Sequence, residues 1–121
     1  MPREPIIIDA KGDVELFASL AAAETALEPV DVANEEYKIF DSEGVLLGAM
    51  VATDGIHVRI VESSPPDRQP EELVSVLRRF LSRVGNDLTG MAEEEIWRAP
   101  LIKLIDVMKV LETHGRRRSF W

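Results

Sequence analysis

The sequence contains no cysteine and only two histidines, His57 and His114. The absence of cysteine excludes disulfide bonds, thiol nucleophiles and thiolate metal sites. A zinc site of the usual kind would then depend on carboxylates, so we expect no bound metal. The phosphate-binding loops, the HExxH motif and the EF-hand loop are also missing, so we expect no cofactor and no enzymatic activity.

Long apolar runs are missing as well. A membrane span needs roughly 18 to 20 apolar residues, and the longest run here, residues 45–52, has the length of a strand. Near the N-terminus only three isoleucines follow Pro5, which is too short for the apolar part of a signal peptide. We therefore expect a cytoplasmic protein that does not bind membranes.

The residues that are present are those of a folded protein with an uneven charge. Of the 121 residues, 45% are hydrophobic and 30% are charged, which predicts a single domain over residues 1–121. Residues 1–57 carry twelve acids and three bases, whereas residues 58–121 carry ten acids and eleven bases. The acidic half argues against a nucleic-acid partner and favours either a solvated surface or a basic protein partner.

Strand patterns occupy most of the first half. Residues 5–18 read as a hairpin, and Ser19 is a good N-cap for a helix over residues 20–28 that Pro29 ends. A loop over residues 30–36 follows. Three further strands are then expected, with turns at residues 41–44 and at Asp54-Gly55; the strands are residues 37–41, 45–53 and 56–61.

Helical patterns dominate the second half, after a loop over residues 62–69. Pro70 suits the first position of a helix that Gly85 ends, and apolar residues recur at helical spacing between them. Another helical region covers residues 92–114, but Pro100 predicts a kink or a boundary within two residues of Ala99. The order β-β-α-β-β-β-α-α predicts an α+β fold, with an antiparallel sheet of about five strands and two C-terminal helices packed on one face.

The chain offers several carboxylates but no arrangement typical of catalysis. The acids lie in expected turns and helix starts, where solvation and the helix dipole account for them. His57 and Arg59 should share one face of the third strand of the meander, where they could line a ligand pocket or serve as a general base and its neighbour. No serine or carboxylate completes a triad by spacing. An exposed or partner-contacting His57 is the favoured interpretation.

The residues that we expect to contact a partner lie at loops, turns and the C-terminus. If the acidic half is a binding face, its acids should be exposed along one side of the sheet. The C-terminal tail joins three arginines to two aromatic residues, which we expect to be partly buried against the body or against a second copy. The candidate residues are Glu35, Glu36, Asp41, Glu43, Asp54, His57, Phe120 and Trp121.

Several strings in residues 6–47 resemble a family of short, uncharacterised bacterial α+β proteins, some of which are similar to the immunity proteins encoded beside polymorphic toxins. The resemblance implies a function in protein binding and brings no catalytic residue with it. The strings that carry it are Ile8-Asp9-Ala10-Lys11-Gly12-Asp13, Phe17-Ala18-Ser19, Ala23-Glu24, residues 27–32, Glu36-Tyr37 and residues 41–47.

Three functions follow as hypotheses. The first is a non-enzymatic acidic binding protein, in the form of an immunity protein that neutralises a basic bacterial toxin. The second is a small regulatory or assembly module that forms a homodimer through its C-terminal helix and tail. The third is a small-molecule-binding or enzymatic domain around His57 and Arg59.

Overall fold

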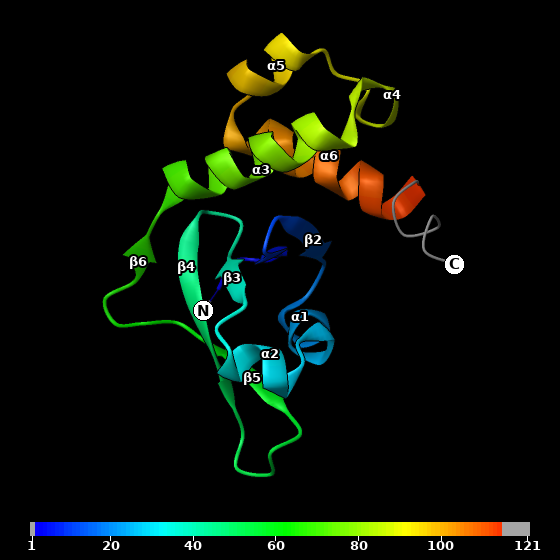
Figure 1. The fold of residues 1–121 in the computed structure, drawn as a ribbon. Coiled ribbons are helices and arrows are strands. Elements are labelled where there is room, and N and C mark those ends of the chain that lie inside the picture. Colours follow the sequence, from blue (N-terminus) through cyan, green and yellow to red (C-terminus); the bar gives the residue numbers. More distant parts are fainter. Residues whose placement is uncertain (1, 115–121) are drawn as a thin grey trace.

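The computed structural model describes residues 2–114 and places them in one antiparallel sheet with helices on both faces (Figure 1). The sheet has the strand order β2-β1-β3-β4-β5, and a sixth, two-residue strand pairs with β4. The elements, in chain order, are β1 (Ile6–Ala10), β2 (Asp13–Phe17), α1 (Leu20–Ala26), α2 (Pro29–Ala33), β3 (Tyr37–Phe40), β4 (Val45–Val51), β5 (Val58–Val61), β6 (Asp67–Arg68), α3 (Pro70–Val84), α4 (Asn86–Thr89), α5 (Glu93–Arg98) and α6 (Leu101–His114).

The strand register separates the side chains of the sheet into two sets. Ile7 pairs with Leu16 on one side and with Phe40 on the other, and Phe40 pairs with Leu46. Because side chains alternate along a strand, these residues share one face, and their neighbours in sequence share the opposite face. Each face of the sheet therefore has a continuous apolar surface, which other elements must bury.

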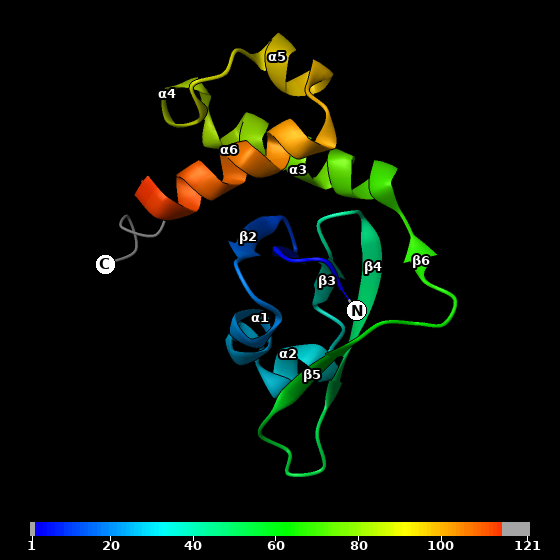
Figure 2. The same ribbon diagram turned by 180° about the vertical axis from the view of Figure 1, so that it is seen from behind.

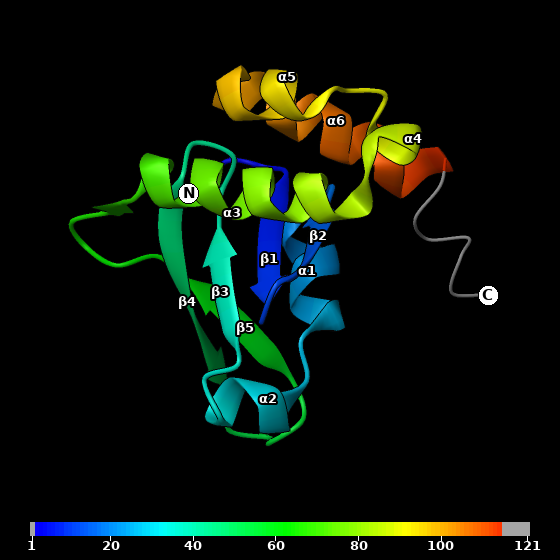
Figure 3. The same cartoon turned by 45° about the horizontal axis from the view of Figure 1, so that its top comes forward.

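The C-terminal helices cover the first of these faces. The core there joins Ile7, Val14, Leu16 and Phe40 of the sheet to the buried residues of α3, α5 and α6. Figure 3 shows α3 crossing the strands. Helix α3 has Pro70 at its start, two glutamates in its first turn and Gly85 at its end, and its buried residues recur every three or four positions. The expected packing of C-terminal helices on one sheet face is confirmed.

The opposite face has a core of its own, covered by α1 and α2 (Figure 2). Ala23 and Leu27 supply the helical side, and Ile6, Ile8 and Ile39 are among the sheet residues below them. The Ser19 side chain accepts a hydrogen bond from the Ala22 amide, which confirms the predicted N-cap. Each face of the sheet is therefore buried by helices from a different half of the chain.

Some elements differ from the sequence expectation. Helix α2 occupies residues that we expected to form a loop, because Pro29 ends one helix and begins the next, where its fixed φ and missing N–H are tolerated. Helix α4 and strand β6 are too short for their patterns to stand out. The break at Pro100 is confirmed, since α5 ends with Ala99 as its C-cap and α6 begins at Leu101.

Candidate functional site

One end of the sheet gathers the exposed acidic and apolar side chains that suit a protein partner. We call it the hairpin end and define it by α2 with the flanking residues Glu28, Glu35 and Glu36, and by the β4–β5 turn over residues 52–57. Because β3 and β4 are antiparallel, the start of β3 after α2 lies beside the end of β4. Figure 1 shows α2 and this turn at the same end of the molecule, away from α3.

The acids at the hairpin end differ in how they are held. The Glu35 side chain is exposed and, within the described part of the chain, has no ion-pair partner; its backbone has a φ of 55°, at the end of α2. Glu36 is half-buried, and its carboxylate lies 3.1 Å from the Lys11 ammonium. Asp31 accepts a hydrogen bond from the Tyr37 hydroxyl at 3.1 Å, which ties α2 to β3. Burial of the Tyr37 ring is the main reason why the pKa of its hydroxyl is raised.

Two large apolar side chains project from the same end. Val30 on α2 is 60% exposed, and Ile56 in the β4–β5 turn is 71% exposed. Apolar side chains at this level of exposure, with acids around them, are typical of protein interaction surfaces when they cluster. Neither residue stands out in the sequence as a site residue. Val30 lies in α2 and not in the expected loop, although Pro29 could have indicated this helix. Ile56 precedes the strand that we expected to contain it, because β5 starts only at Val58.

Asp54 and His57 organise the β4–β5 turn. The Asp54 carboxylate accepts hydrogen bonds from the amides of His57 at 3.0 Å and Ile56 at 2.9 Å, and its Oδ2 contacts Nδ1 of the His57 ring. These bonds, with the His57 amide first among them, lower the pKa of Asp54 far below that of a free aspartate. Both side chains are exposed, as the sequence led us to expect. The pair positions the turn that carries Ile56.

The lowered pKa of Asp54 predicts how the stability of this turn depends on pH. Because the folded-state pKa lies below the unfolded value, the stabilisation is complete above that unfolded value, at about pH 4, and is lost as pH falls through the folded-state pKa. The stability difference between wild type and Asp54→Asn should be largest at about pH 5 and shrink toward about pH 2, as measured by denaturant titration. A difference that stays constant over this range would show that the carboxylate charge does not hold the turn.

The structure also places His57 and Arg59 in one hollow, between β5 and α1, with a volume of about 580 Å³. Glu24 and Thr25 of α1 line its other side, and the Glu24 carboxylate accepts a hydrogen bond from the Ile60 amide at 2.8 Å. The Thr25 hydroxyl donates to the Ala21 carbonyl. The Glu24 carboxylate and the Thr25 hydroxyl are therefore both already hydrogen-bonded to backbone groups of the protein itself.

Asp41 does not belong to a binding face, and our expectation that it is exposed is wrong. Its side chain is 1% exposed and accepts three backbone hydrogen bonds, from Arg3, Glu43 and Val45, at 2.9 to 3.1 Å. Glu43 is exposed as expected, with its carboxylate 3.8 Å from the Arg3 guanidinium.

The expectation that the acids lie along one side of the sheet is also wrong. Asp41 and Glu43 lie in the β3–β4 turn, whereas Glu35, Glu36 and Asp54 lie at the opposite end of these two strands. The antiparallel pairing of β3 and β4 causes the separation, because consecutive turns of a meander fall at alternate ends of the sheet. Phe120 and Trp121, the remaining candidates, lie outside the described residues.

No family model, curated protein or solved structure matches this chain. None of the helices described between residues 2 and 114 is long and apolar enough to cross a membrane. Over the same residues, no group of three histidine, aspartate or glutamate side chains is placed to hold a metal ion. The candidate site therefore rests on the geometry of the hairpin end.

Proposed function

We propose that this chain is a non-enzymatic binding protein that docks a basic protein through its hairpin end. The observation that carries the proposal is that one end of the molecule exposes both Val30 and Ile56 and the side chains of Glu28, Glu35 and Asp54. Apolar side chains at the centre of an interface supply affinity, and charges around them steer the approach of a partner with the opposite charge.

The overall charge supports the same partner chemistry. A chain with a net charge of −8 attracts basic proteins over distances of about one Debye length, roughly 8 Å at physiological ionic strength. At the hairpin end three acids already have partners, because Lys11 pairs with Glu36, His57 contacts Asp54 and the Tyr37 hydroxyl donates to Asp31. Glu35 has none among the described residues, so its charge is available to a partner.

The biological form that we propose for this binding is an immunity protein that neutralises a basic toxin domain in the bacterial cytoplasm. An immunity protein acts by covering a surface of its toxin, so it needs a complementary surface and no catalytic group. The hairpin end has the mixture of charge and apolar area that such covering requires.

Reversing two charges at the hairpin end should slow association with a basic partner. The variant is Glu28→Lys/Glu35→Lys, and the basic products of neighbouring genes are the partners to test. The association rate should fall by about tenfold or more at low salt, and the defect should shrink above about 0.15 M salt because ions screen the charges. Stability should change by less than about 1 kcal/mol, since both side chains are exposed.

The matched control separates local charge from net charge. Glu94 and Asp106 are exposed on α5 and α6, so Glu94→Lys/Asp106→Lys changes the net charge by the same amount elsewhere on the protein. The control should bind almost like wild type. Equal rates for all three proteins at low salt would overturn the proposal. Association of the chain with itself alone, seen by light scattering, would favour the homodimeric module instead.

A further inference from the structure

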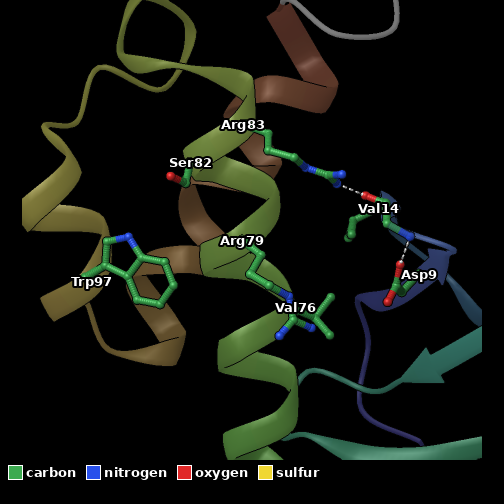
Figure 4. Close-up of a pocket in the computed structure, with 8 residues that line it drawn as sticks. Asp9, Val14, Val76, Arg79, Ser82, Arg83 and Trp97 are labelled. Carbon is green, nitrogen blue, oxygen red and sulfur yellow. Dashed lines mark hydrogen bonds between the residues drawn. The ribbon is translucent and has the colours of Figure 1, made fainter.

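A second hollow, none of whose lining residues belongs to the hairpin end, lies along α3. We call it the α3 hollow; it has a volume of about 350 Å³ and is bounded by the β1–β2 turn on one side and by α5 on the other (Figure 4). Arg79, Ser82 and Arg83 of α3 line it, with Val76 and Val14 as apolar floor and Trp97 as one wall. This volume is at the lower end of the range for small-molecule sites and suits a ligand of about one ring.

The two arginines are one helical turn apart, and each is held by a contact that leaves most of its donors available. Arg83 donates from Nη2 to the Gly12 carbonyl, and Arg79 donates from Nη1 to Oγ of Ser75 at 2.9 Å. A guanidinium has five N–H donors, so each can still bind an anion from a fixed position. Figure 4 shows Arg83 extended from α3 toward the β1–β2 turn.

Gly12 allows the guanidinium of Arg83 to lie close to the β1–β2 turn. A Cβ atom at this residue would lie 3.2 Å from both Nη1 and Nη2 of Arg83, and the φ of Gly12 is 97°, which other residues rarely adopt. The Gly12 amide donates to Oδ1 of Asp9 at 2.7 Å. Because Gly12 has no side chain, the turn exposes its backbone carbonyl, and the Arg83 guanidinium donates a hydrogen bond to it.

Trp97 is held in place from the opposite side. Its indole Nε1 donates to Oε1 of Glu93 at 2.8 Å, and the Ser82 hydroxyl also donates to this oxygen. The indole is about half-exposed, so one part of it faces solvent over the hollow. An aromatic or aliphatic group can bury itself against this surface and against Val76, because aromatic side chains offer large contact areas at low entropic cost.

We propose that the α3 hollow binds a small organic anion, whose carboxylate or phosphate pairs with Arg79 and Arg83 and whose apolar part packs against Trp97 and Val76. The charge of the lining agrees with this ligand. Two guanidinium groups line the hollow together with one carboxylate, Asp9, whose Oδ1 accepts the Gly12 amide. A second carboxylate, Glu93, lies beside the lining residues Ser82 and Trp97, and its Oε1 accepts a hydrogen bond from each of them. Arginine recognises carboxylate and phosphate groups through paired N–H donors, and an aromatic wall beside it selects for an apolar body.

The test uses two probes that share a ring and differ in their anionic group, phenylacetate and phenyl phosphate. Trp97 and Trp121 are the two tryptophans, so Trp121→Phe leaves Trp97 as the sole indole reporter in NMR and fluorescence. At least one probe should shift the Trp97 indole N–H signal saturably, with a dissociation constant of about 1 mM. The probe that binds more tightly shows whether the hollow prefers a carboxylate or a phosphate. Neutral phenylacetamide should bind about tenfold more weakly.

Variants connect the binding to the two arginines. Arg79→Gln/Arg83→Gln should weaken the tighter probe by about tenfold or more, and Arg79→Gln alone should weaken it by less. Arg68→Gln/Lys103→Gln removes two positive charges from exposed residues outside the hollow and should bind the probe like wild type. The proposal is overturned if neither probe saturates by about 10 mM. Equal binding of phenylacetamide, or unchanged binding by the double arginine variant, would overturn it as well.

Discussion

Phe80→Ala is expected to lower the free energy of unfolding by about 3–5 kcal/mol. Phe80 lies in the C-terminal half of α3, is 7% exposed and belongs to the core that joins α3 to the sheet and to α6. Removing its ring loses buried apolar area and leaves a cavity that the surrounding helices fill only in part. Denaturant titration followed by circular dichroism measures the change.

The control for Phe80 is a large apolar residue on the outside of the same helical layer. Ile102 on α6 is exposed, and alanine is a better helix former than isoleucine, so Ile102→Ala should change stability by less than about 0.5 kcal/mol. A loss below about 1 kcal/mol for Phe80→Ala would contradict the packing of α3 on the sheet.

Asp41→Ala is expected to destabilise the protein by about 2–4 kcal/mol. The Asp41 carboxylate accepts the amides of Glu43 and Val45 through Oδ1 and the amide of Arg3 through Oδ2. Alanine would leave these three donors without their acceptor at the point where the N-terminal segment meets the β3–β4 turn. Thermal and chemical unfolding measure the loss.

A graded series tests this role of Asp41. Asp41→Asn keeps an oxygen that can accept the amides of Glu43 and Val45, but it places an amide donor against the Arg3 amide. Its loss of unfolding free energy should therefore be about half that of Asp41→Ala. In the folded fraction of either variant, partner binding through the hairpin end should remain, since the β3–β4 turn lies at the other end of β3 and β4. Stability within about 0.5 kcal/mol of wild type for Asp41→Ala would contradict the structural role.

Local patterns were sufficient to predict most of the elements. The boundaries of α3 follow from Pro70, the acidic first turn and Gly85, and the break before α6 follows from Pro100, because proline and glycine constrain the backbone regardless of their surroundings. Alternating and continuous apolar runs likewise predicted the strands of the two hairpins. The α+β class followed from the order of these elements.

The positions of the acids relative to one another were decided by the tertiary structure. Asp41 and Glu35 look alike in the sequence, as acids at the ends of an expected strand. Asp41 is buried and accepts hydrogen bonds from three backbone amides, whereas Glu35 is exposed at the hairpin end. The difference arises because the burial of a turn residue depends on which distant segment packs against that turn. Here the N-terminal segment around Arg3 covers the β3–β4 turn.

The α3 hollow is likewise a product of the tertiary structure alone. Its arginines and Trp97 come from separate helices, and Gly12 comes from the other half of the chain. Gly12 and Arg83 are in contact only because α3 packs on the sheet face formed by β1 and β2, which brings its C-terminal end to the β1–β2 turn. The sequence by itself determined the local elements of this protein and its acidic charge. Packing between segments distant in sequence determined which charges are free to bind, because contacts of that kind leave no periodic pattern in either segment.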